Sequence, residues 1–263
     1  MEATLLCPVC GEPLSRTART YTCPRGHSYD ISRFGYVNLL SGKPPAVGDN
    51  REMIAARART LDRGIYAPLR EALAEAAVCR GLLLDCGCGE GYYTEAMATG
   101  AAATVGIDIS KDALRAAARR LPSATLAVAS AYHLPLADGA VDCLSCIFAP
   151  QATEEYHRVL ANGATLVLAI PGARHLFEMK TILYDTPYEN EVAPYDLPGF
   201  SLTGERTVGF RFTLRGADAI GDLFMMTPYY YRTPKGGRER LAATDTLSAT
   251  AEFHVLTYRK EPQ

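Results

Sequence analysis

Short apolar runs alternate with stretches of helical periodicity through the middle of the chain. These runs have the length and the aliphatic content of buried strands, and they cover Leu82–Cys86, Ala103–Ile107, Thr125–Ala129, Val141–Ile147 and Thr165–Ile170. Helical stretches separate them, and this alternation is typical of a parallel sheet flanked by helices. We therefore expect an α/β fold here.

The pattern differs on both sides of this region. Asn50 to Val78 has apolar residues at helical spacing, with breaks near Gly64 and Pro68. Beyond Pro171 the pattern predicts a helix and then two strands at the edge of the sheet, over Arg174–Tyr184, Phe200–Leu214 and Ala249–Arg259. The large domain is accordingly expected to cover residues 51–263.

Residues 1–40 lack a helical period and are rich in Cys, Pro, Gly and aromatic residues. We interpret them as a small separate module. Residues 41–50 contain Gly42, Pro44, Pro45 and Gly48, which indicate a linker.

The composition is that of a soluble globular chain, with 263 residues, 48% apolar and 21% charged. Because no apolar run approaches about 18 residues and no signal peptide precedes Cys7, we expect no membrane contact and a cytoplasmic location. In that reducing compartment cysteines are metal ligands or packing residues. Five cysteines lie in or beside apolar runs and are expected to be packing residues of the core: Cys79, Cys86, Cys88, Cys143 and Cys146.

The net charge of −2 is unevenly distributed. Residues 1–80 carry eleven Lys and Arg against eight Asp and Glu, and the rest of the chain carries sixteen against twenty-one. A basic N-terminal segment is weak support for a nucleic-acid-binding face.

Four residues near the start have the spacing of a metal site. Cys7 and Cys10 flank one knuckle, Cys23 and His27 flank a second, and twelve residues separate the pairs. Three thiolates and one imidazole complete a tetrahedral zinc shell, so the site is expected to be structural rather than catalytic. The alternative is four unrelated loop residues.

The first strand of the large domain runs into a glycine-rich turn. Asp85, Gly87, Gly89, Glu90 and Gly91 follow one another there, in a strand-turn-helix context that suits an adenosyl ligand. Asp108 ends the next strand, where an acidic residue can bind ribose hydroxyls. The alternatives are a purely structural turn or an NAD site.

The Asp-x-Gly-x-Gly turn resembles the S-adenosylmethionine motif of class I methyltransferases more than the dinucleotide fingerprint. The sequence thus predicts a class I, Rossmann-like methyltransferase fold with a mostly parallel sheet, plus a zinc-ribbon-like domain. Ser130 is a departure, because an acidic residue often stands at that strand end to bind adenine.

Taken together, the chain resembles the bacterial 23S rRNA (guanine-N1)-methyltransferases of the RlmA type, including relatives that give macrolide resistance. The resemblance covers most of the chain. Besides the zinc ligands and Asp85 to Thr94, it depends on residues 35–40, Tyr66 to Arg70, Phe148-Ala-Pro150 and residues 171–176. In two places the chain departs from the family pattern: Leu160-Ala-Asn-Gly163-Ala replaces a Pro-Gly-Gly type turn, and Phe148 replaces a Tyr.

The resemblance implies methyl transfer from S-adenosylmethionine to N1 of a guanine in a 23S rRNA hairpin loop. It adds Tyr66 and His175 to the cofactor-contact positions, beside Gly89 and Glu90, and it suggests a homodimer. For Tyr66 and His175, helix packing is an equally good reading of the sequence. The basic residues around the zinc module would contact RNA phosphates, and they are Arg16, Arg19, Arg25 and Arg33.

The chemistry requires the guanine to leave its stack, and we expect it to enter a pocket near Phe148-Ala-Pro150. No catalytic base is assigned, because His133, His175 and Glu90 are candidates by location alone and positioning can suffice. Two other functions stay open: a small-molecule methyltransferase, and an inactive RNA-binding protein. Absence of RNA affinity would favour the small-molecule methyltransferase. Binding of cofactor and RNA without turnover would favour the inactive RNA-binding protein.

Overall fold

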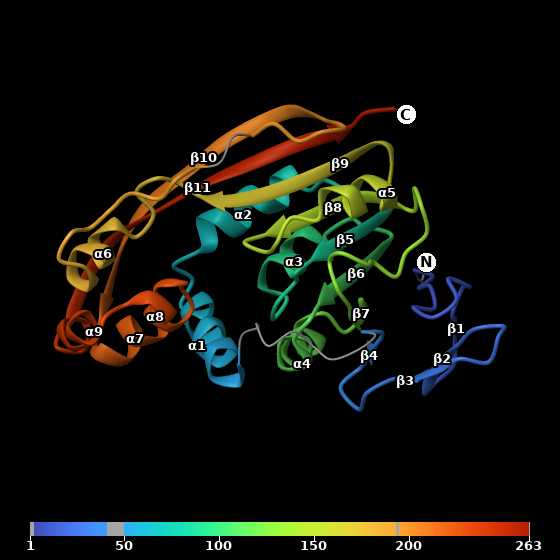
Figure 1. The fold of residues 1–263 in the computed structure, drawn as a ribbon, viewed down its shortest axis with the longest axis horizontal. Coiled ribbons are helices and arrows are strands. Elements are labelled where there is room, and N and C mark those ends of the chain that lie inside the picture. Colours follow the sequence, from blue (N-terminus) through green and yellow to red (C-terminus); the bar gives the residue numbers. More distant parts are fainter. Residues whose placement is uncertain (1–2, 41–49, 193–194, 263) are drawn as a thin grey trace.

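A computed structural model of the chain describes residues 3–40, 50–192 and 195–262. Two sheets organise it (Figure 1). The smaller sheet is antiparallel and consists of β1 (Ser15–Arg16), β2 (Thr20–Thr22) and β3 (Ser28–Asp30). The expected linker at residues 41–50 lies almost wholly outside the described residues, so the division into domains stays a prediction.

The larger sheet has eight strands in the order β10-β11-β9-β8-β5-β6-β7-β4. Their bounds are β4 (Tyr36–Asn38), β5 (Leu82–Cys86), β6 (Ala103–Asp108), β7 (Thr125–Val128), β8 (Val141–Ile147), β9 (Leu160–Pro171), β10 (Phe200–Arg215) and β11 (Thr246–Lys260). Neighbouring strands from β4 to β9 are parallel, whereas β11 is antiparallel to both β9 and β10. The mostly parallel sheet predicted from the sequence is confirmed.

Helices cover the sheet and one end of the molecule. Their bounds are α1 (Arg51–Asp62), α2 (Ala67–Ala76), α3 (Tyr92–Met97), α4 (Lys111–Arg120), α5 (Thr153–Val159), α6 (Phe177–Leu183), α7 (Ala217–Met225), α8 (Tyr229–Arg232) and α9 (Lys235–Ala242). Asn50 caps α1 by accepting from two main-chain N–H groups, and Ser110 caps α4. In Figure 1, α6 to α9 gather beyond the ends of β10 and β11, far from the small sheet.

Strand alternation separates two apolar cores. Leu83 belongs to the cluster that includes buried residues of α2, α6 and α7, whereas Leu84 belongs to the cluster that includes Leu5 and Leu14 of the N-terminal module. The module is also tied to the large domain by the main chain, since Leu6 N–H donates to the carbonyl of Pro135 at 2.9 Å. The two parts of the chain therefore share a core.

Strand predictions agree closely with the structure, and helix predictions less so. β5 and β8 have the expected bounds, while β9 begins five residues early at Leu160. The helix expected from Arg174 begins at Phe177, because Leu176 has a left-handed backbone (φ 53°) that cannot continue a helix. Helices α7 to α9 and strand β4 were not predicted. No helix among the described residues is long and apolar enough to span a membrane.

Candidate active site and metal centre

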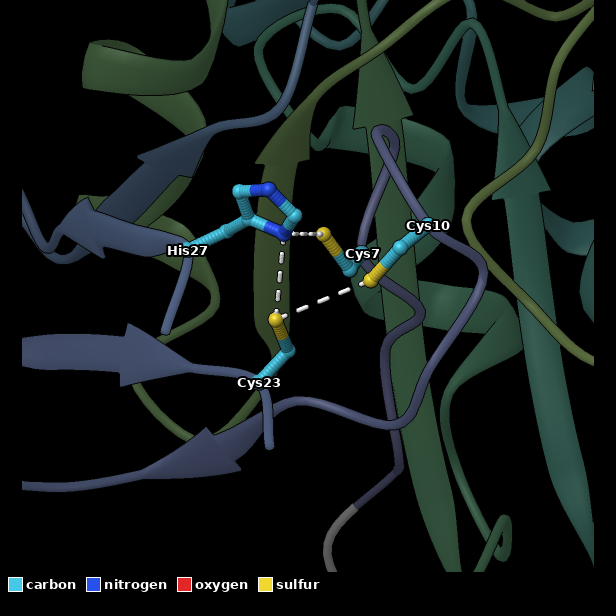
Figure 2. A group of neighbouring side chains, drawn as sticks. All are labelled: Cys7, Cys10, Cys23 and His27. Carbon is cyan, nitrogen blue, oxygen red and sulfur yellow. Dashed lines mark hydrogen bonds between the residues drawn. The ribbon is translucent and has the colours of Figure 1, made fainter. Parts of the chain in front are cut away.

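Cys7, Cys10, Cys23 and His27 converge on one point, as Figure 2 shows, with all four ligand atoms within 4.8 Å of one another. Each knuckle is closed by a main-chain hydrogen bond, from Gly11 N–H to the Cys7 carbonyl and from Gly26 N–H to the Cys23 carbonyl. His27 contributes Nδ1, which lies 3.5 Å from Cys7 Sγ and 3.3 Å from Cys23 Sγ.

These spacings fit a tetrahedral zinc ion. Zn–S bonds of about 2.3 Å and Zn–N bonds of about 2.0 Å place two sulfurs about 3.8 Å apart, and a sulfur and a nitrogen about 3.5 Å apart. Cys10 Sγ and Cys23 Sγ are 3.7 Å apart. With four protein ligands the shell has no open position, so the zinc is structural.

Tyr29 supports the metal centre from outside the ligand shell. Its hydroxyl lies 3.2 Å from Cys7 Sγ, within hydrogen-bonding distance. Burial opposes ionisation of Cys7, but the Tyr29 hydroxyl and main-chain N–H groups outweigh it and lower the pKa of this thiol to about 6. The environment thus favours the thiolate that zinc binds.

The glycine-rich turn joins β5 to α3, and its three glycines have positive φ of 83°, 56° and 82°. A Cβ on Gly87 would lie 2.4 Å from Ala149 Cβ, and one on Gly91 would lie 2.9 Å from a Leu121 methyl. Beside Gly89, in contrast, nothing lies within 4 Å of the corresponding position. Gly87 and Gly91 therefore allow close packing, and Gly89 leaves room for a ligand.

Two acidic side chains lie at this turn. Asp108 accepts the Gly89 N–H at 2.9 Å and the Ser110 N–H at 2.8 Å, so it fixes the turn against the end of β6. Glu90 is 3% exposed, and its Oε2 atom has no hydrogen-bond partner among the described residues. Burial raises the pKa of Glu90, although Arg57 and Arg120 partly offset this. A buried carboxylate oxygen of this kind suits a ligand that donates hydrogen bonds.

Asp85 lies beneath the turn and has both carboxylate oxygens engaged. It accepts from Thr94 Oγ1 at 2.5 Å and from Ser145 Oγ at 2.7 Å. Burial raises the pKa of Asp85 to about 6, and the two hydroxyl groups moderate the rise. This carboxylate connects β5 to α3 and β8, which holds the turn in place.

Ser130 follows β7 and closes a local turn. Its Oγ accepts the Tyr132 N–H at 3.2 Å, and its carbonyl accepts the His133 N–H at 3.1 Å. The neighbouring Ala129 N–H donates to the Asp108 carbonyl at 3.2 Å. Asp85, Asp108 and Ser130 thus lie at the carboxyl ends of three neighbouring parallel strands, β5, β6 and β7. His133 is exposed.

Tyr66 and His175 share one neighbour, Phe253 of β11. The Phe253 ring centroid is 5.5 Å from that of Tyr66 and 4.5 Å from that of His175. Burial, followed by the charge of Lys180, lowers the pKa of His175 to about 3, so its imidazole is neutral. Phe253 was not singled out in the sequence, where its only signal is an apolar position in a strand.

The arginines expected to bind RNA are all exposed, and they are Arg16, Arg19, Arg25 and Arg33. Arg33 has a partner that the sequence did not indicate. Its guanidinium lies 4.8 Å from the centroid of Phe34, and Arg115 of α4 lies 4.3 Å from the same ring. This pair of contacts joins the zinc module to the large domain.

Comparison with known proteins gives two family matches. Residues 5–43 match the family described as "RlmA, N-terminal", and residues 84–168 match "Methyltransferase domain". The first spans the metal centre and β4. The second begins in β5 and ends in β9, so it covers the glycine-rich turn.

Relatives match nearly the whole chain. A protein of Micromonospora griseorubida, provisionally named 23S rRNA (guanine-N1)-methyltransferase, is 36% identical over 97% of both chains. The 23S rRNA (guanine(748)-N1)-methyltransferase of Streptomyces fradiae is 37% identical over 85% of this chain and 84% of its own. Among solved structures, a provisionally assigned type II methyltransferase from Anaeromyxobacter dehalogenans has a TM-score of 0.53 at 23% identity, covering 74% of this chain and 96% of its own. That likeness concerns the fold alone.

Proposed function

The chain belongs to the 23S rRNA (guanine-N1)-methyltransferases of the RlmA type, and from that premise we propose that it methylates N1 of a guanine in a 23S rRNA hairpin loop. The observation that carries the proposal is a similarity that spans both the metal centre and the glycine-rich turn. S-adenosylmethionine, when bound, supplies an electrophilic methyl group on a sulfonium. The bond from N1 to the methyl carbon forms as the carbon–sulfur bond breaks, and the N1 proton passes to solvent or to an acceptor that is not assigned.

The cofactor contacts that we propose follow from the chemistry of each side chain. The space beside Gly89 admits the ligand close to the main chain, and Glu90 offers its buried oxygen to a hydrogen-bond donor. Asp108 is proposed to bind the ribose hydroxyls, as acidic residues at this strand end do in related folds. His175 is neutral, so one ring nitrogen can donate a hydrogen bond. Tyr66, Asp85, Gly87, Gly91 and Ser130 shape the same edge.

The zinc module is proposed to bind the phosphates of the RNA hairpin. Its exposed arginines carry positive charge to a surface next to the catalytic domain, where phosphate contacts would fix the register of the hairpin. The zinc holds the knuckles together and does not take part in methyl transfer.

Two further points belong to the proposal. A cytoplasmic location follows from the substrate, since ribosomal RNA is made and modified there. A homodimer is proposed from the family, and β10, which ends the eight-stranded sheet, offers one edge for such an assembly. Light scattering on the purified protein measures the mass and decides between monomer and dimer.

The function is tested with labelled S-adenosylmethionine and unmodified 23S rRNA transcript. N1 methylation blocks Watson–Crick pairing, so primer extension should stop at one hairpin-loop guanine, and changing that guanine to adenine should abolish labelling. RNA binding without labelling would favour an inactive RNA-binding protein. Labelling of small molecules alone, with no affinity for RNA, would favour a small-molecule methyltransferase.

A further inference from the structure

Two non-glycine residues in the described parts of the chain have a left-handed backbone: Phe148 with φ 56° and Leu176 with φ 53°. Such a conformation is strained for an ordinary side chain and is concentrated at functional sites. Phe148 directly follows β8, and Leu176 directly follows His175. Both strained positions therefore border the site described above.

Phe148 is 47% exposed, although two aromatic rings contact it. Its ring centroid is 5.3 Å from that of Phe253 and 6.3 Å from that of Tyr93. These two rings support it from inside the protein and leave part of it accessible. A large apolar side chain that is packed on one side and exposed on the other is suited to receive a flat ligand.

Phe148 is also close to the turn that is proposed to hold the cofactor. The next residue, Ala149, lies directly against Gly87, where an added Cβ would come within 2.4 Å of its own. On its inner side Phe148 meets Phe253, and Phe253 in turn meets Tyr66 and His175. One packed aromatic unit thus connects the accessible ring to the cofactor positions.

We propose that the ring of Phe148 is the surface on which the acceptor guanine stacks once it has left the RNA loop. This inference rests on the proposed function and names the residue that positions its substrate. Stacking on an aromatic ring is available to any base and contributes to the affinity for an unpaired nucleotide. The left-handed backbone after β8 and the contacts with Phe253 and Tyr93 together set where the ring lies.

The first test uses fluorescence, because the chain contains no tryptophan. Phe148→Trp creates a single reporter, and we expect unmodified 23S rRNA transcript with S-adenosylhomocysteine to quench it. Val78→Trp is the matched control, since Val78 is 73% exposed and lies before β5, at the opposite edge of the sheet. Quenching of Phe148→Trp alone supports the proposal. No quenching, or equal quenching of both variants, overturns it.

The second test is kinetic and uses Phe148→Gly. This change removes the ring and relieves the backbone strain, and we expect the melting temperature to confirm that the fold is kept. We expect kcat/KM for the transcript to fall by about 5- to 150-fold, the range that loss of one stacking contact implies. Phe148→Tyr should retain activity, and the affinity for S-adenosylmethionine should be unchanged in both. Normal kcat/KM in Phe148→Gly, or loss of cofactor affinity instead, overturns the proposal. If the wild-type protein labels no RNA at all, the proposed function itself fails.

Discussion

The Nδ1 atom of His175 accepts a hydrogen bond from the main-chain N–H of Glu252 at 3.3 Å. Because Nδ1 is the acceptor, the proton of the neutral imidazole is assigned to Nε2. The bond holds the turn after β9 against β11, and the same turn carries the left-handed Leu176. A residue that the sequence marks only by resemblance therefore has a defined tautomer and orientation.

We expect His175→Gln to bind S-adenosylmethionine more tightly than His175→Asn. A glutamine amide can replace the Nε2–H donor, whereas asparagine replaces only the acceptor toward Glu252. Loss of one hydrogen bond should weaken the affinity by about 2- to 10-fold, as measured by calorimetry. If both variants bind like the wild-type protein, His175 does not contact the cofactor.

His175 should also make stability depend on pH with a known sign. Its pKa is about 3 in the folded protein, against about 6.5 when unfolded, so only the unfolded chain gains a proton between these values. This contribution to stability is complete above pH 6.5 and is lost as the pH falls toward 3. We expect the slope of the unfolding free energy between pH 4 and 6 to be smaller in His175→Gln. An unchanged slope in urea titrations would contradict the low pKa.

We expect Glu90→Gln to make the cofactor-free protein more stable and to weaken its affinity for S-adenosylmethionine. Burial raises the pKa of Glu90 above its ordinary value, so its charge destabilises the fold increasingly as the pH rises above about 4.5. Gln carries no charge, so without cofactor the variant should be more stable than the wild-type protein at pH 8, as measured by urea unfolding.

Its affinity for S-adenosylmethionine should fall by about 10- to 100-fold, because a charged acceptor is lost. Glu95→Gln is the control, since that carboxylate forms an ion pair with Arg70 at the surface. The expectation fails if Glu90→Gln binds the cofactor normally.

Without its metal the zinc module should lose the fold of its two knuckles, whereas the glycine-rich turn of the large domain should be retained. Cys10→Ser removes one ligand and should abolish stoichiometric zinc, as measured by elemental analysis, with loss of RNA affinity but not of cofactor affinity. Tyr29→Phe removes only the hydroxyl near Cys7 and should weaken zinc binding by about 10- to 100-fold. Loss of cofactor affinity in Cys10→Ser would show that the two sites are coupled.

The ring of Phe34 should fix the zinc module against α4. Phe34→Leu removes the surface that Arg33 and Arg115 share, and RNA affinity should fall by about 2- to 5-fold with an unchanged salt dependence. Arg115→Ala should in addition lower the slope of log affinity against log salt by about 1 if it contacts a phosphate. Arg119→Ala is the control, since Arg119 is exposed one turn further along α4, and an equal effect there would contradict a special role for Arg115.

The sequence by itself determined the features that depend on neighbouring residues. Two Cys-rich knuckles specify a metal site because ligand spacing is local, and the ends of β5 and β8 follow from apolar runs bounded by turn residues. The glycines of the turn between β5 and α3 predicted a main chain that can approach a ligand closely, and the three glycines have positive φ values.

Contacts between distant segments were decided only by the tertiary structure. Phe148 and Phe253 are more than a hundred residues apart in the sequence, and the hydrophobic periodicity of neither segment predicts that their rings are in contact. β4 has three residues and lies in a module expected to be separate, yet it pairs with β7 because that edge of the sheet has main-chain groups to satisfy. The tautomer of His175 was likewise set by the register of β11. Periodicity reports which face of an element is buried, whereas the partner on that face is chosen by the packing of the whole chain.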